Sequence, residues 1–149
     1  MPNTDTAGVD IRGPRFSAWI TTAVLIGVLL IAGISPIGAA ALLAAQAAVF
    51  AIGTLAGPRR HPYGVLFARL VAPRLSPVTE REPVAPLRFA QLVGLIFAVI
   101  GVAGFGAAPV VGLTATALAL AAAFLNAAFG ICLGCQLYPL VARLRPTPA

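Results

Sequence analysis

Charged residues and the usual catalytic groups are scarce in this sequence. Only 9% of the 149 residues are charged, against about a quarter in soluble domains. Lysine is absent, histidine occurs once and cysteine twice. A water-soluble fold of this size would lack the polar surface to cover itself. The sequence also lacks a Ser-His-Asp set, a phosphate-binding loop and carboxylates within its apolar segments, which argues against a hydrolase or an ion pump.

Apolar runs dominate what is present. Hydrophobic residues make up 60% of the chain, and four uncharged stretches are each long enough to cross a bilayer core of about 30 Å. We therefore predict one all-α, polytopic membrane domain over residues 1–149, with four transmembrane helices in two hairpins. The predicted helices cover 16–34, 37–56, 88–105 and 110–131, the last with an option to continue through the cysteines to Pro139. The first run is longer than a signal-peptide core, so we expect it to be retained.

The segments between these helices carry the charges. We expect an N-terminal tail over 1–15, an arginine-rich loop over 57–88 and a C-terminal tail over 140–149. Within the loop, residues 63–71 have the pattern of a short helix lying in the headgroup plane, and the proline-rich remainder should be extended.

The distribution of arginines predicts the orientation of the chain. Two precede the first helix, six lie in the central loop and two follow the last helix, so all ten fall on one side of the membrane. By the positive-inside rule this side is the cytoplasm, which places both termini inside a multi-pass protein of the cell inner (plasma) membrane. The arginines flank apolar runs and form no basic face, so we expect lipid phosphates as their partners and no nucleic acid.

The two cysteines, Cys132 and Cys135, are the strongest candidates for chemistry. Residues three apart face the same way on a helix and lie within disulfide range, and a reducing cytosol argues against a permanent bridge. The pair is interpreted as a cycling dithiol, as half of a four-thiolate metal site between two subunits, or as two packed side chains. At the C-terminal end of a helix the macrodipole disfavours a thiolate, unless Gly130 and Gly134 break the helix before Cys135.

Polar side chains inside the apolar segments are candidate supporting residues. Gln46, Gln91 and Asn126 are expected to hydrogen-bond to neighbouring helices, with a place in a substrate or quinone pocket as the alternative. His61 is expected to be a solvated loop residue.

Three further residues flank the predicted membrane segments. Arg15 and Arg88 each start a helix, where lipid phosphates or a salt bridge to Glu80 or Glu82 are the expected partners. Tyr138 follows the cysteine pair and is included with the site.

Several stretches together resemble the domain-of-unknown-function 4395 family, small integral membrane proteins common in actinobacteria. They are 9–16, 61–64, 73–75, 88–94 and 124–135, with Tyr138; the Arg-Phe-Ala-Gln run at 88–91 and the Cys-Leu-Gly-Cys run at 132–135 are the most specific. The resemblance implies a four-helix membrane protein and no established activity. Because family members tend to be encoded near thioredoxin-like and rhodanese-type proteins, it also suggests redox or sulfur metabolism.

Three hypotheses for function follow, and whether the protein is an enzyme stays open among them. The first is a thiol-disulfide or sulfur-relay component, in which Cys132 and Cys135 exchange with a cytosolic thioredoxin-like or rhodanese-type partner. The second is a non-catalytic subunit of a membrane assembly, with packed or metal-bridging cysteines and a homo-oligomeric state as an option. The third is a quinone-linked thiol oxidoreductase resembling vitamin K epoxide reductases, ranked last because the predicted topology puts the cysteines on the other side. The sequence identifies no cofactor.

Overall fold

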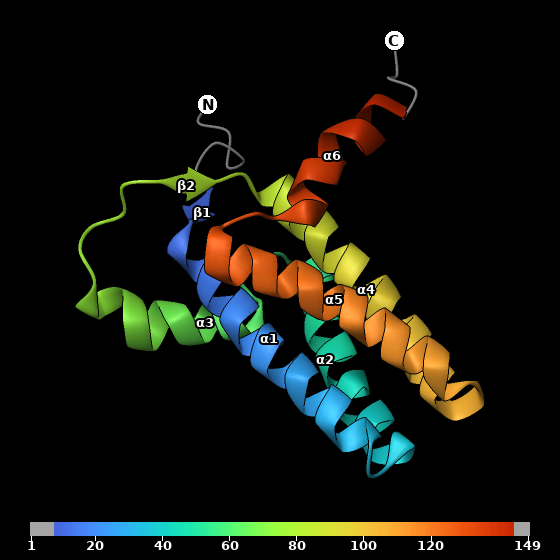
Figure 1. Cartoon of the computed structure of the whole chain (residues 1–149). Helices are drawn as coiled ribbons and strands as arrows, with labels where there is room; N and C mark the ends of the chain where they lie inside the picture. The colour runs from blue at the N-terminus through green and yellow to red at the C-terminus, as the bar shows by residue number, and fades with distance from the viewer. Residues whose placement is uncertain (1–7, 145–149) are drawn as a thin grey trace.

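The computed structural model describes residues 8–144 and shows a bundle of four long helices arranged as two hairpins (Figure 1). The helices are α1 (Arg12–Ala32), α2 (Pro36–Ala56), α4 (Val84–Ala107) and α5 (Pro109–Phe129). All four are long and apolar enough to cross a membrane. The predicted all-α fold with four membrane helices is therefore confirmed.

Two of the helices begin four residues earlier than predicted, α1 at Arg12 and α4 at Val84. The predicted helix starts are too late because each true start precedes a proline, Pro14 or Pro86, and proline usually interrupts a helix. Each proline is the third residue of its helix, where the backbone N–H has no intrahelical partner to lose. The expected tail over 1–15 is consequently wrong for residues 12–15, which form the first turn of α1.

The central loop is more structured than expected. The predicted short helix is present as α3 (Pro62–Leu66), which continues through a π-helical turn, η2 (Phe67–Val71), into a 3₁₀ turn, η3 (Ala72–Arg74). Phe67 is buried, and its ring centroid lies 5.7 Å from that of Phe16 on α1. The segment therefore packs across the end of the bundle. Its position in a headgroup plane stays a prediction.

A two-stranded ribbon joins the rest of this loop to the N-terminal segment. Strand β1 (Val9–Asp10) pairs antiparallel with β2 (Arg81–Glu82), with Val9 opposite Glu82. The sequence carries no strand pattern of useful length here, and the ribbon was not predicted. It ties the start of α1 to the segment that leads into α4.

The bundle has two dissimilar halves along its length (Figure 1). The turn half, residues 25–43 and 98–119, contains both hairpin turns and most of the buried apolar core. The arginine half, residues 8–24, 44–97 and 120–144, contains β1, β2, α3 and the last helix, α6 (Leu133–Leu144). All described arginines lie in the arginine half, as the predicted orientation requires, while the side of the membrane stays a prediction.

Candidate functional site

The fourth long helix ends before the cysteines, at a glycine cap. Gly130 adopts a left-handed conformation with φ of 70°; its N–H donates to Asn126 O (3.0 Å) and that of Ile131 to Leu125 O (3.2 Å). This glycine-dependent cap closes α5. The predicted end at Ile131 is therefore too late, and the option of one helix running to Pro139 is wrong, because the chain turns and starts α6 at Leu133.

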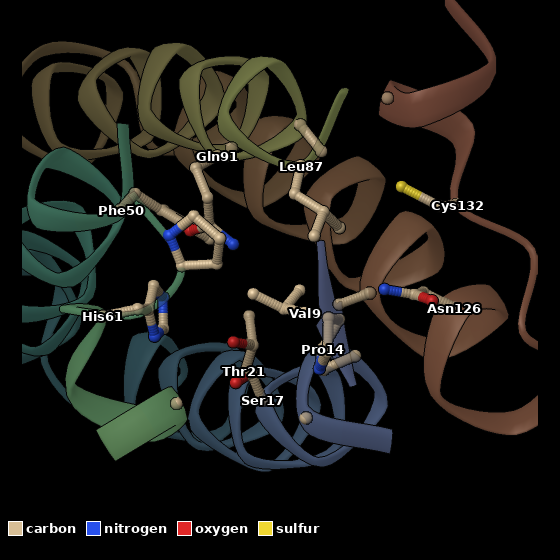
Figure 2. A pocket seen from close by; sticks show the side chains of 18 of the residues that line it. Val9, Pro14, Ser17, Thr21, Phe50, His61, Leu87, Gln91, Asn126 and Cys132 are labelled. Atoms are coloured by element: carbon tan, nitrogen blue, oxygen red, sulfur yellow. The ribbon is translucent and has the colours of Figure 1, made fainter. Parts of the chain in front are cut away.

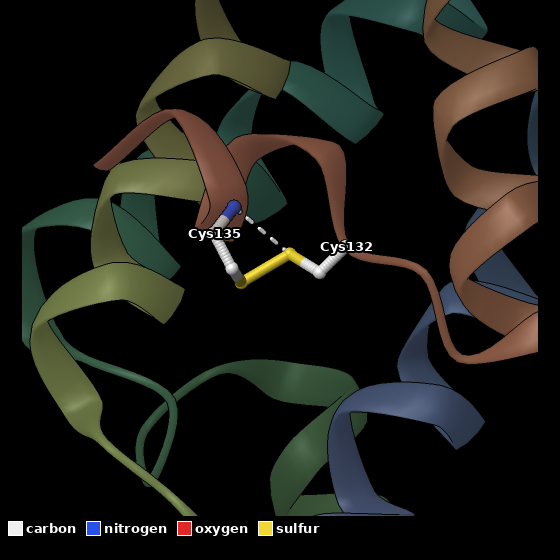
Figure 3. The surroundings of a disulfide bond; sticks show 2 residues. All are labelled: Cys132 and Cys135. Carbon is white, nitrogen blue, oxygen red and sulfur yellow. Dashed lines mark hydrogen bonds between the residues drawn. A yellow bond between two sulfur atoms is a disulfide. The ribbon is translucent and has the colours of Figure 1, made fainter. Parts of the chain in front are cut away.

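The cysteines lie at the start of α6 and are joined by a disulfide (Figure 3). Their Cα atoms are 5.2 Å apart. Cys132 immediately precedes the helix, and the backbone N–H of Cys135 donates to Cys132 Sγ at 3.1 Å. The predicted obstacle to a thiolate is thus removed, because the pair stands at a helix N-terminus, where the macrodipole favours negative charge. Both residues are half-buried.

Contacts with α4 hold α6 and its cysteines in place. A methyl group on Gly134 would lie 2.7 Å from Ala90 Cα, so the glycine between the two cysteines sits directly against the α4 backbone. Tyr138, one turn later, has its ring centroid 5.9 Å from that of Phe89. Pro139 lies within α6 and does not end it. The structure therefore gives Tyr138 a role in docking α6.

A cavity of about 700 Å³ opens inside the arginine half (Figure 2). Cys132 and Asn126 line one wall, while His61 and Gln91 face them from the other side. Ser17 and Thr21 of α1 line it between them. Cys135 does not line this cavity, so the two sulfur-bearing residues differ in what they face.

His61 is buried in the cavity wall, and the expectation of a solvated loop residue is wrong. Only 3% of its surface is exposed. Its Nδ1 accepts a hydrogen bond from Tyr63 N–H at 3.2 Å, which caps α3 and leaves the proton of the neutral ring on Nε2. Burial lowers the pKa of His61 to about 4, and the neighbouring Gln91 side chain opposes the shift. His61 is therefore a neutral hydrogen-bond donor near pH 7.

Three buried polar atoms have no hydrogen-bond partner within residues 8–144: Gln46 Nε2, His61 Nε2 and Gln91 Oε1. The first belongs to a side chain that fulfils the predicted interhelical bond, because Tyr63 Oη donates to Gln46 Oε1 at 2.7 Å. The side chains of His61 and Gln91, which carry the other two atoms, both lie against Gly53. A methyl group added there would lie 2.7 Å from His61 Cδ2 and 2.9 Å from Gln91 Oε1. Gln91 and Asn126 both line the cavity, and their place in a substrate or quinone pocket stays a prediction.

Arg15 and Arg88 cap helices and form no ion pair with the acidic residues found between positions 8 and 144. Arg15 donates to Ala127 O and Ala128 O at the end of α5 (3.3 and 3.4 Å). Arg88 donates to Thr54 O and Leu55 O at the end of α2, at 2.9 Å each. Guanidinium groups stabilise such free carbonyls and the negative helix end, so the predicted salt bridges to Glu80 or Glu82 are wrong.

Within the described part of the chain, the structure shows one salt bridge, Arg12 to Asp10 at 2.8 Å. The same residues contain no cluster of three or more histidine, cysteine or acidic side chains that could hold a metal ion. A metal site shared between two subunits would take its ligands from both chains, and it stays a prediction.

Comparison with protein families gives one match. The model of a domain of unknown function (DUF4395) matches residues 9–143, which is nearly the whole chain. No curated protein and no solved structure matches.

Proposed function

The chain belongs to the DUF4395 family, and we propose that it is a membrane protein that exchanges disulfides through Cys132 and Cys135. The observation that carries this proposal is the position of the pair at the N-terminus of α6, with the Cys135 N–H directed at Cys132 Sγ at 3.1 Å. In the reduced state this hydrogen bond and the helix dipole stabilise a thiolate on Cys132. Both cysteines are partly accessible, which exchange requires.

The two sulfur atoms take different roles. A thiolate of a partner protein attacks Cys135 Sγ, forming a mixed disulfide and breaking the Cys132–Cys135 bond. Cys132 leaves as the thiolate that α6 stabilises, since a thiol of lower pKa is the better leaving group. The second thiol of the partner then attacks its own bridged sulfur and releases Cys135. The partner departs oxidised, and this chain holds two thiols.

The partner in this exchange is a cytosolic protein with a thioredoxin-like pair of thiols. A rhodanese-type protein, which has one reactive cysteine, would need a second thiol from another molecule to release Cys135. The exposed arginines, among them Arg59, Arg60 and Arg74, lie in the same half of the bundle as the cysteines and supply a positive surface for an acidic partner. We infer that the protein lies in the plasma membrane with both termini in the cytoplasm, because arginine-rich segments tend to stay on that side.

Maleimide labelling in membranes tests both the chemistry and the orientation. The pH dependence of labelling gives the pKa of each thiol. In the Cys135→Ser variant, the pKa of Cys132 should lie below the usual value of about 8.5, and in the Cys132→Ser variant the pKa of Cys135 should be higher than that of Cys132. Membrane-impermeant maleimide should reach the reduced pair only from the cytoplasmic side. Thiols that neither label nor reoxidise would refute exchange and favour a non-catalytic subunit with packed cysteines.

A further inference from the structure

We propose that the cavity of the arginine half binds the ring of a lipid-soluble quinone, which accepts electrons from the Cys132–Cys135 dithiol. This inference rests on the proposed thiol chemistry and names its electron acceptor. It starts from two polar atoms at the cavity wall, His61 Nε2 and Gln91 Oε1, which have no partner at good hydrogen-bond geometry although the two side chains lie close enough to interact with each other. A buried polar atom without a hydrogen bond costs folding free energy, and a ligand that satisfies it recovers that cost.

The two unpartnered atoms match both redox states of a quinone. His61 Nε2 carries a proton and donates, so it suits the carbonyl oxygen of the oxidised ring. Gln91 Oε1 accepts, so it suits the hydroxyl group that the same oxygen becomes on reduction. The two side chains lie together over Gly53, which allows one ring oxygen to exchange one partner for the other. A saturated lipid chain would satisfy neither atom.

The remaining walls suit an aromatic ring with a hydrocarbon tail. Phe50 and Leu87 border the cavity beside His61 and Gln91 (Figure 2). Phe97 and Leu118 line both the cavity and a neighbouring apolar groove of about 280 Å³ between α4 and α5. Leu118 is 54% exposed on the outer face of α5. A tail that leaves along this groove would reach the lipid, which favours a membrane quinone over a small soluble one.

Cys132 is the residue that faces the ring, since it lines the cavity and Cys135 does not. The Cys132 thiolate adds to a ring carbon and forms a C–S bond. Cys135, as its thiolate, then attacks Cys132 Sγ; the S–S bond forms and the C–S bond breaks. The ring keeps the electron pair and takes up the two protons that the thiols released. One dithiol and one quinone thus become one disulfide and one quinol.

Quinone binding to the full chain in phosphatidylcholine nanodiscs tests the site. With decylubiquinone and a short-tailed menaquinone as probes, binding should be saturable and exceed partition into empty nanodiscs. His61→Asn keeps an acceptor for the Tyr63 N–H cap and draws the remaining N–H donor back from the position of Nε2, because the amide is shorter than the imidazole ring. Gln91→Leu removes the acceptor. Each should weaken binding roughly tenfold, the effect of losing one buried hydrogen bond. Thr54→Val, which removes a hydroxyl of α2 that bonds Phe50 O outside the cavity lining, is the matched control and should bind normally.

The cysteines separate this inference from the proposed function. The Cys132→Ser/Cys135→Ser variant should still bind quinone saturably but produce no quinol, whereas the reduced parent should produce one quinol per disulfide. Thiols that exchange with a protein partner, combined with no saturable quinone binding, would overturn the quinone site alone. Saturable binding that His61→Asn weakens, with cysteines that stay inert, would support the site and refute thiol exchange. Equal quinone binding by the parent, His61→Asn and Gln91→Leu would also overturn the quinone site.

Discussion

The two halves of this bundle differ in how closely their helices pack. In the turn half, small residues let helix backbones touch: a methyl group on Gly104 of α4 would lie 2.5 Å from Gly112 N of α5, and one on Gly101 would lie 2.5 Å from Leu43 Cδ2. The arginine half instead supplies most of the lining of an open cavity of about 700 Å³, which also reaches Leu118 and Ala119 of the turn half. The first half is closely packed, and the second is hollow.

The difference shows where this fold can hold chemistry. Close packing of small residues is what associates helices in lipid, where the hydrophobic effect between them is absent. Both hairpin turns and most of the core lie in the turn half. That stability offsets the unpartnered Nε2 of His61 and Oε1 of Gln91 in the other half, each costing about 1–3 kcal/mol. A cavity with unsatisfied polar atoms persists because the opposite end is well packed.

The largest expected effect comes from disrupting the packed half at Gly104. Gly104→Ala should destabilise the protein by about 3 kcal/mol, because the new methyl group meets the Gly112 backbone, which cannot move aside as a side chain does. Gly106→Ala, two residues along the same helix, has nothing within 4 Å of its methyl group and should be neutral. Unfolding of the two variants in detergent measures the difference. Equal stabilities would contradict the close crossing of α4 and α5.

A smaller effect is expected from protonating the hollow half at His61. Its pKa is about 4 in the folded chain against a usual value of 6.5, so the unfolded chain binds more protons between these values. Stability should therefore be complete above about pH 6.5 and fall as the pH decreases, by about 2 kcal/mol between pH 7.5 and pH 5. Burial raises the pKa of Glu82, which acts in the opposite direction. Unfolding measured against pH in the parent and in His61→Asn isolates the histidine, and equal slopes would contradict its burial.

The sequence predicts the packed half better than the hollow one. Length and hydropathy suffice for the four helices, and the uncharged segments Ser35-Pro36-Ile37-Gly38 and Gly106-Ala107-Ala108-Pro109 mark the two hairpin turns. The errors concentrate where helices begin and end in the arginine half. Pro14 and Pro86 were interpreted as breaks although a proline in a first turn loses no hydrogen bond. The β1–β2 ribbon depends on pairing between residues about 70 apart, which a two-residue strand cannot signal.

The sequence indicates the cysteines of the candidate site, but not the helix end at which they lie or the burial of His61 beside the cavity. The spacing of Cys132 and Cys135 indicates a pair, but whether the pair ends one helix or starts another depends on the conformation of Gly130. That glycine was recognised only as a possible break. His61 was missed because a histidine among arginines resembles a solvated residue. Its place before Pro62, at the start of α3, was the available signal, since residues at that position cap helices with their side chains.

The smallest expected change in stability, about 1 kcal/mol, comes from Gly134→Ala, which breaks the contact that docks the cysteine pair on the bundle. A methyl group there would lie 2.7 Å from Ala90 Cα, so α6 must move away from α4. No residue of α6 is fully buried, which keeps the cost low. The reduced cysteines should nevertheless react several-fold faster with maleimide, because both are half-buried in the docked position. Gly33→Ala in the turn between α1 and α2, where the methyl group makes an ordinary contact of 3.6 Å with Leu30 O, should change neither property. Unaltered labelling of Gly134→Ala would mean that another contact, such as Tyr138 with Phe89, positions α6.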